Sequence, residues 1–137
     1  MPTVQDLTRF FAEQFPQSRV LIESVGDQRA RVRRPVGFAD LRPGGTVSGP
    51  VLMEVADVAL YVAILGEIGI VPLAVTTSLN INFLRKPEAG VDILADCTLL
   101  KVGRTLVIGE VSLYSDGLPE PVAHAVGTYS VPPRKAA

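Results

Sequence analysis

Two carboxylates lie inside an otherwise apolar stretch of this sequence, and carboxylates so placed can do acid–base or nucleophilic chemistry. In residues 51–65, the side chains other than Glu54, Asp57 and Tyr61 are all apolar. An ionised carboxylate enclosed by apolar groups is costly unless it is paired or hydrogen-bonded. Asp57, in the middle of the stretch, is therefore the first candidate for a catalytic group. The alternative is a structural carboxylate that bonds backbone groups or pairs with an arginine.

Glu54 is the second candidate carboxylate. It precedes Asp57 by three residues, which places both side chains near the same face of a helix. Glu54 also lies close to the expected start of that helix, where a negative charge interacts favourably with the helix dipole. Its presence can therefore be explained without a role in the chemistry.

The glycine-containing segment of residues 45–50, directly before this stretch, is the third feature that suggests chemistry. A glycine at a helix N-terminus lets a ligand carbonyl approach the backbone, and a free N–H there can polarise it. Pro50 has no N–H, so the donor is Gly49 or a residue after the proline. The structural alternative is that Ser48 or Gly49 simply caps the helix.

Other catalytic patterns fit the sequence poorly. Ser48 is not in a Gly-x-Ser-x-Gly elbow, because Thr46 stands two positions before it. The single histidine, His124, lies in an expected late strand and is a weak candidate for a triad with Ser48 and Asp57. We expect the single cysteine, Cys97, to be a packed thiol. No metal-ligand spacing or nucleotide fingerprint is present, so no metal or cofactor is expected.

The candidate residues need a helix to position them. A segment that is apolar on all sides indicates a helix buried on all sides. Pro50 suits the first turn, and Gly66 and Gly69 suit the other end, so we expect a central helix over about 50–66. A second, amphipathic helix is expected over about 3–15, where a capping-box pair begins an apolar pattern of helical spacing.

Alternating patterns predict the strands that surround the central helix. Residues 19–34 suggest a hairpin with its turn at Gly26 and Asp27. Four consecutive strands are expected at residues 75–84, 91–101, 104–115 and 122–131. Their separators, including residues 87–90, predict hairpin connections. The result is an α+β domain with one antiparallel sheet curled around one helix, and a long loop over residues 35–50 that we expect to be functional.

The composition limits the classes of partner. The chain has 137 residues, 47% of them hydrophobic and 20% charged, with a formal net charge of −1. That is enough apolar material for one core, and the mixed charges show no basic stripe for nucleic acid or anionic membrane. The N-terminus lacks the pattern of a secretory signal, and the longest apolar run is too short to span a bilayer. We therefore expect a cytoplasmic protein whose partner is a small molecule.

Three segments together resemble a known family. Residues 46–59, residues 74–87 with their Phe-Leu-Arg-Lys-Pro ending, and residues 100–106 with their Gly-Arg turn match it in order and spacing. The family is the hotdog-fold acyl-CoA thioesterases of the phenylacetate-degradation type, in the 4-hydroxybenzoyl-CoA thioesterase superfamily. The resemblance covers most of residues 20–131. It implies a single hotdog domain over residues 1–137 that hydrolyses an acyl-CoA, with an aryl or medium-chain acyl group, to free acid and CoA.

The resemblance also implies roles for particular residues. In the family a His-Gly-Gly motif opens the central helix and the catalytic acid follows the histidine by nine residues. Ser48 stands at the histidine position, Gly49 and Pro50 at the glycines, and Asp57 at the acid. Gly49 would then polarise the thioester carbonyl through its N–H, and Asp57 would activate water or attack the carbonyl itself. Arg42 stands where the family often has Asn or Gln.

Arg42 has two possible roles, since it can hold the substrate or pair with Asp57. Pairing would favour the ionised carboxylate, and it could equally quench that group as a base. The candidate substrate-binding residues are Arg42, Ser48, Glu54, Tyr61, Thr77, Arg85, Lys86 and Arg104, the last three where the family binds CoA phosphates. Coenzyme A would be part of the substrate and not a cofactor. The resemblance further implies a homodimer, or a dimer of dimers, with sheets joined edge to edge and the active site between subunits.

Two other functions are compatible with the sequence. Ser48 and Arg42, which replace the family's usual polar groups, favour a non-catalytic protein that binds acyl-CoA or acts in assembly. Hydratase or dehydratase chemistry on the same fold is a weaker candidate, because it needs a histidine beside the acid and only His124 is available.

Overall fold

Helix α2 spans Gly49–Ile68 in the computed structural model of the protein, which describes residues 1–133. The helix has Pro50 in its first turn and is capped at its C-terminus by Gly69, whose φ of +99° favours glycine. The prediction of a long buried helix is confirmed, with an end two residues later than expected. The last four residues of the predicted domain, 134–137, lie outside the described residues.

Gly66 was predicted to help end this helix, and that prediction is wrong. The residue lies inside α2 and is buried. A Cβ atom placed on it would come within 2.3 Å of a methyl group of Val25. The glycine therefore permits close packing of the helix against strand β1, Leu21–Gly26. No helix within residues 1–133 is long and apolar enough to cross a membrane.

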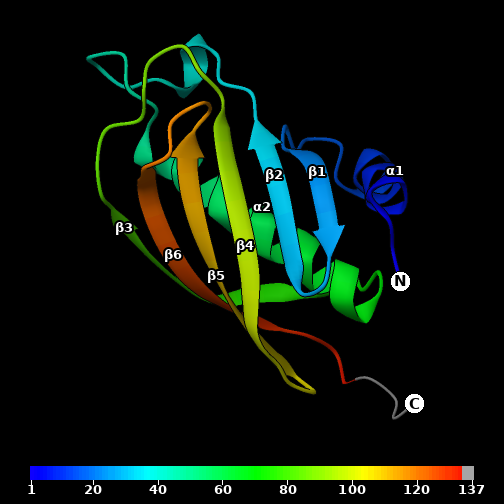
Figure 1. Ribbon diagram of the computed structural model, residues 1–137. Helices are drawn as coiled ribbons and strands as arrows, with labels where there is room; N and C mark the ends of the chain where they lie inside the picture. Colours follow the sequence, from blue (N-terminus) through cyan, green and yellow to red (C-terminus); the bar gives the residue numbers. More distant parts are fainter. Residues whose placement is uncertain (134–137) are drawn as a thin grey trace.

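Six antiparallel strands form a single sheet that curls around α2 (Figure 1). The strands are β1 Leu21–Gly26, β2 Arg29–Arg34, β3 Val75–Phe83, β4 Ile93–Val102, β5 Leu106–Ser115 and β6 Pro121–Ser130. The hairpin of β1 and β2 turns at Asp27 and Gln28, which both have positive φ, one residue later than predicted. The α+β hotdog architecture expected from the sequence is confirmed.

The order of strands is β1-β2-β4-β5-β6-β3, so β3 lies at the edge beside β6. The prediction that residues 87–90 join two neighbouring strands in a hairpin is therefore wrong. Residues 84–92 instead cross from the edge strand to the middle of the sheet (Figure 1). Strand lengths follow from local pattern, whereas the choice of neighbour depends on pairing between distant segments.

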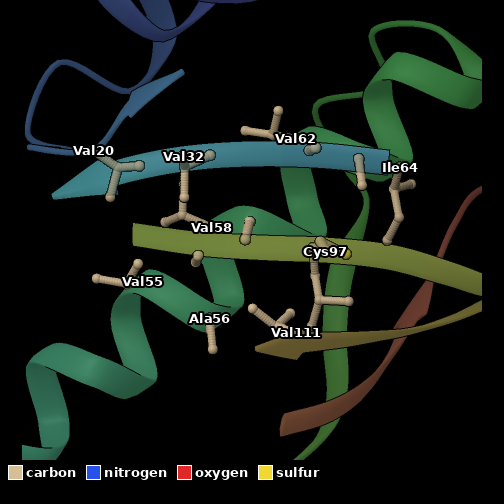
Figure 2. Close-up of a cluster of buried hydrophobic side chains, with 14 of the residues drawn as sticks. Val20, Val32, Val55, Ala56, Val58, Val62, Ile64, Cys97 and Val111 are labelled. Atoms are coloured by element: carbon tan, nitrogen blue, oxygen red, sulfur yellow. The ribbon is translucent and has the colours of Figure 1, made fainter. Parts of the chain in front are cut away.

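Side chains from the concave face of the sheet enclose α2. Figure 2 shows this core, in which Val32, Cys97 and Val111 from three strands face Val58 and Val62 of the helix. The expected packing of Cys97 is confirmed, since the residue is 1% exposed. Burial raises the pKa of the Cys97 thiol to about 12.

Two glycines let the sheet approach the middle of the helix. Gly109 and Gly127 are paired across β5 and β6, and a Cβ on either would lie within 2.7 Å of Leu60. The side chain of Leu60 therefore fills the notch that the two missing side chains leave. This close contact fixes the depth at which α2 lies in the curled sheet.

Helix α1, Val4–Gln14, lies beside β1 at one side of the molecule (Figure 1). The predicted capping box is present, with Asp6 donating its amide N–H to Thr3 Oγ1 and accepting from the Thr3 amide. The apolar side of the helix buries Leu7, Phe10 and Phe11. This packing carries the aromatic residues of α1 toward the middle of α2.

Candidate active site

Asp57 lies on the side of α2 that faces strands β3 and β6. Its Oδ1 atom accepts a hydrogen bond from Thr76 Oγ1 at 2.6 Å and one from Tyr129 Oη at 2.8 Å. Within the described residues, Oδ2 has no hydrogen-bond partner and no cation lies in ion-pair contact with the carboxylate. Asp57 is thus held at one carboxylate oxygen by neutral donors, and the other oxygen has no partner in residues 1–133.

Tyr129 lies on β6 with its hydroxyl directed at Asp57. The side chain is 3% exposed, and Oη also lies 3.0 Å from the backbone carbonyl oxygen of Asp57. Burial, and then the negative charge of Asp57, raise the pKa of Tyr129 well above its ordinary value. The phenol therefore stays protonated and acts as a donor.

A pocket of about 400 Å³ opens beside Asp57. Its walls come from α1, α2, β3, β6 and the segment between α2 and β3, and they are mainly apolar. The lining residues are Phe10, Gln14, Phe15, Glu54, Asp57, Val58, Tyr61, Pro72, Ala74, Val75, Thr76 and Tyr129. An apolar pocket with a few convergent polar groups is the usual form of a small-molecule site.

Aromatic contacts hold α1 against this pocket. The ring of Tyr61 on α2 lies 6.4 Å from that of Phe10, 6.0 Å from that of Phe11 and 6.1 Å from that of Tyr129, measured between centroids. The Tyr61 hydroxyl donates to the carbonyl oxygen of Pro72 at 3.2 Å. Tyr61 thus links the N-terminal helix to the wall that contains Asp57.

Glu54 reaches the same pocket but has a different partner. Its Oε1 atom accepts from Arg34 Nε at 3.3 Å, and Arg34 also forms two hydrogen bonds with Asp40, at 2.9 and 3.2 Å. Arg34 is 3% exposed. Burial alone would lower the pKa of Arg34, but the hydrogen bonds and charges of Asp40 and Glu54 outweigh it and the pKa is raised. Arg34 therefore stays charged.

Asp40 connects this ion cluster to the start of α2. It closes the short 3₁₀ helix Phe38–Asp40, and its carbonyl oxygen accepts the amide N–H of Ser48 at 2.9 Å. Ser48 is the N-cap residue of α2, as the structural alternative predicted, but its side chain makes no capping hydrogen bond. Gly49 lies against the ring of Phe83, and an added Cβ would approach that ring to 3.3 Å. As the first residue of α2, Gly49 has an N–H with no intrahelical partner.

The structure separates some residues that the sequence grouped together. Gly49 and Asp57 are eight residues apart on one helix, which is about 12 Å along its axis. Arg42 is exposed in a turn where its amide donates to the Thr46 carbonyl at 2.8 Å. Within one chain, residues 1–133 show no pairing of Arg42 with Asp57, whose hydrogen-bond partners are hydroxyls.

The three cations proposed for CoA phosphates do not meet within one chain. Arg85 follows strand β3 and lies in space beside the start of β6, where its guanidinium donates to the Pro121 carbonyl oxygen at 2.9 Å. The next residue, Lys86, is exposed. Arg104 lies in the β4–β5 connection, beside the opposite end of β6. The length of β6, Pro121–Ser130, between these ends is about 30 Å. One CoA molecule therefore cannot contact both ends through a single chain.

Thr77 was predicted to contact substrate, but its neighbour takes the place beside Asp57. A shift in the β3–β6 register between Thr76 and Ser78 turns Thr76 inward, and Thr77 Oγ1 instead donates to the Thr128 carbonyl at 3.2 Å. Sequence reasoning also missed Tyr129. The alternation of β6, in which Ala125 and Tyr129 are both buried, is the signal that could have placed it inside.

His124 lies on the other face of the sheet. Its neighbours Ala123 and Ala125 are buried against the core, while His124 is half-exposed and lies 3.7 Å from Glu110. A triad of Ser48, His124 and Asp57 is therefore excluded by the geometry, and so is a role for His124 as partner of the acid.

The curled sheet, the central helix and the pocket beside its acid define the hotdog class of α+β proteins. Comparison with known proteins then gives the family. The sequence profile of the Thioesterase superfamily matches residues 44–122, and the chain belongs to this superfamily. Thioester hydrolysis is accordingly the general reaction class. No curated protein sequence matches the chain.

Solved structures agree with this assignment. A candidate thioesterase from Silicibacter sp. TM1040 is 43% identical, with a TM-score of 0.86 over 94% of this chain and 91% of that one. Zebrafish thioesterase superfamily member 2 is 24% identical, with a TM-score of 0.84 over 96% and 100% of the two chains. The Escherichia coli PaaI protein of the phenylacetic acid degradation operon is 20% identical, with a TM-score of 0.82 over 94% and 93%. The last two demonstrate a shared fold.

Proposed function

We propose that the protein is an acyl-CoA thioesterase in which Asp57 acts on the thioester as general base or nucleophile. The observation that carries the proposal is the hydrogen bonding of this carboxylate and its place in the pocket. Its Oδ1 is held by Thr76 and Tyr129, while Oδ2 has no partner in residues 1–133 and the side chain lines the apolar pocket. A carboxylate held by neutral donors keeps the negative charge that either role requires.

The second proposed catalytic group is the N–H of Gly49, contributed by a partner subunit. Within one chain this N–H lies about 12 Å along α2 from Asp57, too far for one thioester carbonyl to meet both groups. Strand β3 is the edge of the sheet that α1 does not cover, and its outer side pairs with no strand of residues 1–133. Its exposed Val75 and Phe83 support the homodimer, joined through this edge, that the family resemblance implies.

The proposed reaction converts acyl-CoA and water into free acid and CoA. As a base, Asp57 takes a proton from water while the water oxygen attacks the thioester carbon. The negative charge that forms on the carbonyl oxygen is stabilised by the Gly49 N–H. The C–S bond then breaks and the CoA sulfur takes the proton from Asp57. As a nucleophile, Asp57 would form an acyl anhydride with loss of CoA, and water would then hydrolyse it.

The acyl group would occupy the pocket beside Asp57. Phe10 of α1 and Phe15 directly after that helix, with Val58 and Tyr61 of α2, give it an apolar wall. Its volume of about 400 Å³ suits an aryl or a medium-chain acyl group. A panel of thioesters distinguishes these two substrate classes.

The predicted cytoplasmic location stays a prediction.

The test is CoA release from aryl- and alkyl-CoA thioesters by the wild type and by Asp57→Asn. We expect kcat to fall by roughly 10²–10⁴-fold in the variant, the usual contribution of a positioned acid–base group. Asp27→Asn, in an exposed turn of positive φ that asparagine tolerates, is the matched control. Circular dichroism would verify that each variant is folded.

Two outcomes would contradict the proposal. Full turnover by Asp57→Asn would remove Asp57 from the chemistry. An inactive wild type that still binds acyl-CoA would support the alternative of a non-catalytic binding protein.

A further inference from the structure

Tyr129 makes the longest-range contact in the site, because it lies 72 residues from Asp57 in the sequence. Its hydroxyl is the only polar group of a side chain that is otherwise packed into the core, and it lies 2.8 Å from Oδ1 of Asp57. A buried hydroxyl needs a hydrogen-bond partner, and Asp57 supplies it through both the carboxylate and the backbone carbonyl. The two residues are thus bonded at a point where the sheet faces the helix.

The direction of this bond determines which carboxylate oxygen can react. Tyr129 and Thr76 both donate to Oδ1, from adjacent strands β6 and β3. Rotation of the Asp57 side chain would break two hydrogen bonds at once. Oδ2 is therefore the oxygen left for a proton or a carbonyl carbon, and its place relative to the pocket depends on the two donors.

The Tyr129 phenol is a neutral donor, which suits the orientation of a carboxylate that has to keep its charge. A cation in the place of Tyr129 would neutralise the carboxylate, whereas a phenol orients it and leaves its charge in place. The phenol ring is itself held, since it stacks on the ring of Tyr61 with centroids 6.1 Å apart. A donor so fixed can impose one orientation on a side chain that it contacts.

The geometry points to Tyr129 as a positioning residue that orients the Asp57 carboxylate for attack. This inference rests on the proposed thioesterase function. The ring of Tyr129 lines the pocket, but its hydroxyl acts through Oδ1 of Asp57 and not on the thioester. Its loss would therefore change the rate of the chemical step and leave substrate binding nearly intact.

The experiment measures kcat and KM for Tyr129→Phe, which removes one oxygen and keeps the ring. We expect kcat to fall on the order of 10- to 100-fold, the usual effect of a misplaced catalytic group, with KM changed less than about threefold. Tyr114→Phe, on strand β5 and away from the pocket, is the matched control and should keep wild-type values. Asp57→Asn is measured in parallel, and thermal unfolding is recorded for every variant.

The outcomes separate this inference from the function on which it rests. Wild-type kcat in Tyr129→Phe, together with an inactive Asp57→Asn, would overturn the role of Tyr129 alone. A raised KM with unchanged kcat would also overturn it, because the Tyr129 hydroxyl would then act in substrate binding. An active Asp57→Asn would overturn both proposals. A folded Tyr129→Phe that loses kcat but keeps KM would support the inference.

Discussion

Glu54 and Asp57 lie one helical turn apart and line the same pocket, yet their surroundings differ. Glu54 is 45% exposed and is bonded to Arg34, a buried cation that it shares with Asp40. Asp57 is bonded to two hydroxyls and lies in ion-pair contact with no cation of the described residues. The comparison teaches that a carboxylate bonded to a cation holds the loop and the helix together. A carboxylate bonded to neutral donors keeps its charge unpaired, and Asp57 is for this reason the one that we propose for the chemistry.

The largest expected effect is on stability and comes from removing Arg34, the cation that distinguishes the surroundings of Glu54 from those of Asp57. Arg34→Met removes the buried cation and leaves buried Asp40 with only the Gly37 amide and, at 4.0 Å, Arg19, which should lower the free energy of unfolding by roughly 3–5 kcal/mol. Urea denaturation measures it, with Arg29→Met, an exposed arginine of the same strand, as control. Adding Asp40→Leu to Arg34→Met should restore part of the loss. A loss no larger than that of the control would show that the cluster is not structural.

The second prediction concerns pH and follows from Asp40. The hydrogen bond from Arg34, and then that from the Gly37 amide, hold the pKa of Asp40 below its ordinary value of 3.8. A carboxyl whose folded pKa is depressed adds stability that is complete above the unfolded pKa and is lost as the pH falls through the folded pKa. Unfolding free energy should therefore decline as the pH falls below about 4.

The measurement for this prediction is urea denaturation at a series of pH values. Asp40→Asn should show a shallower decline in this window than the wild type, because it carries no proton-binding group at residue 40. Asp27→Asn, at an exposed turn, should follow the wild-type curve. Parallel curves for Asp40→Asn and the wild type would contradict the prediction.

The smallest effect is expected for Glu54→Gln. Its bond to Arg34 is half-exposed, so its loss should cost less than about 1 kcal/mol of unfolding free energy. We expect kcat to fall much less than in Asp57→Asn, since the Glu54 carboxylate is already engaged with a cation. Steady-state kinetics of the two variants on one thioester make the comparison direct. Equal losses of kcat would show that the two carboxylates act together.

Much of the fold was predictable because its signals are local. The apolar helix, the capping box at Thr3 and the alternating strands each depend on neighbouring residues and were found at nearly the right positions. The place of β3 was not predictable in this way. Its pairing with β6 instead of β4 depends on contacts between segments that are 40 to 55 residues apart, and no local pattern encodes that choice.

In the candidate site, too, one residue could be predicted from the sequence and its partners could not. Asp57 was recognisable because a carboxylate within a buried apolar helix is costly wherever the rest of the chain lies. Its partners were not, since a one-residue shift in register exchanges the two faces of a strand and so decides between Thr76 and Thr77. Tyr129 required the completed sheet to bring β6 over α2.

By itself, the sequence determined that one buried helix carries an acid, because hydrophobic periodicity and the cost of burying charge act locally. Only the tertiary structure decided which groups bond that acid. It placed the hydroxyls of Thr76 and Tyr129 on Asp57 and the guanidinium of Arg34 on Glu54. These pairings depend on strand order, on the register shift in β3 and on the depth of α2 in the sheet, which arise from long-range packing.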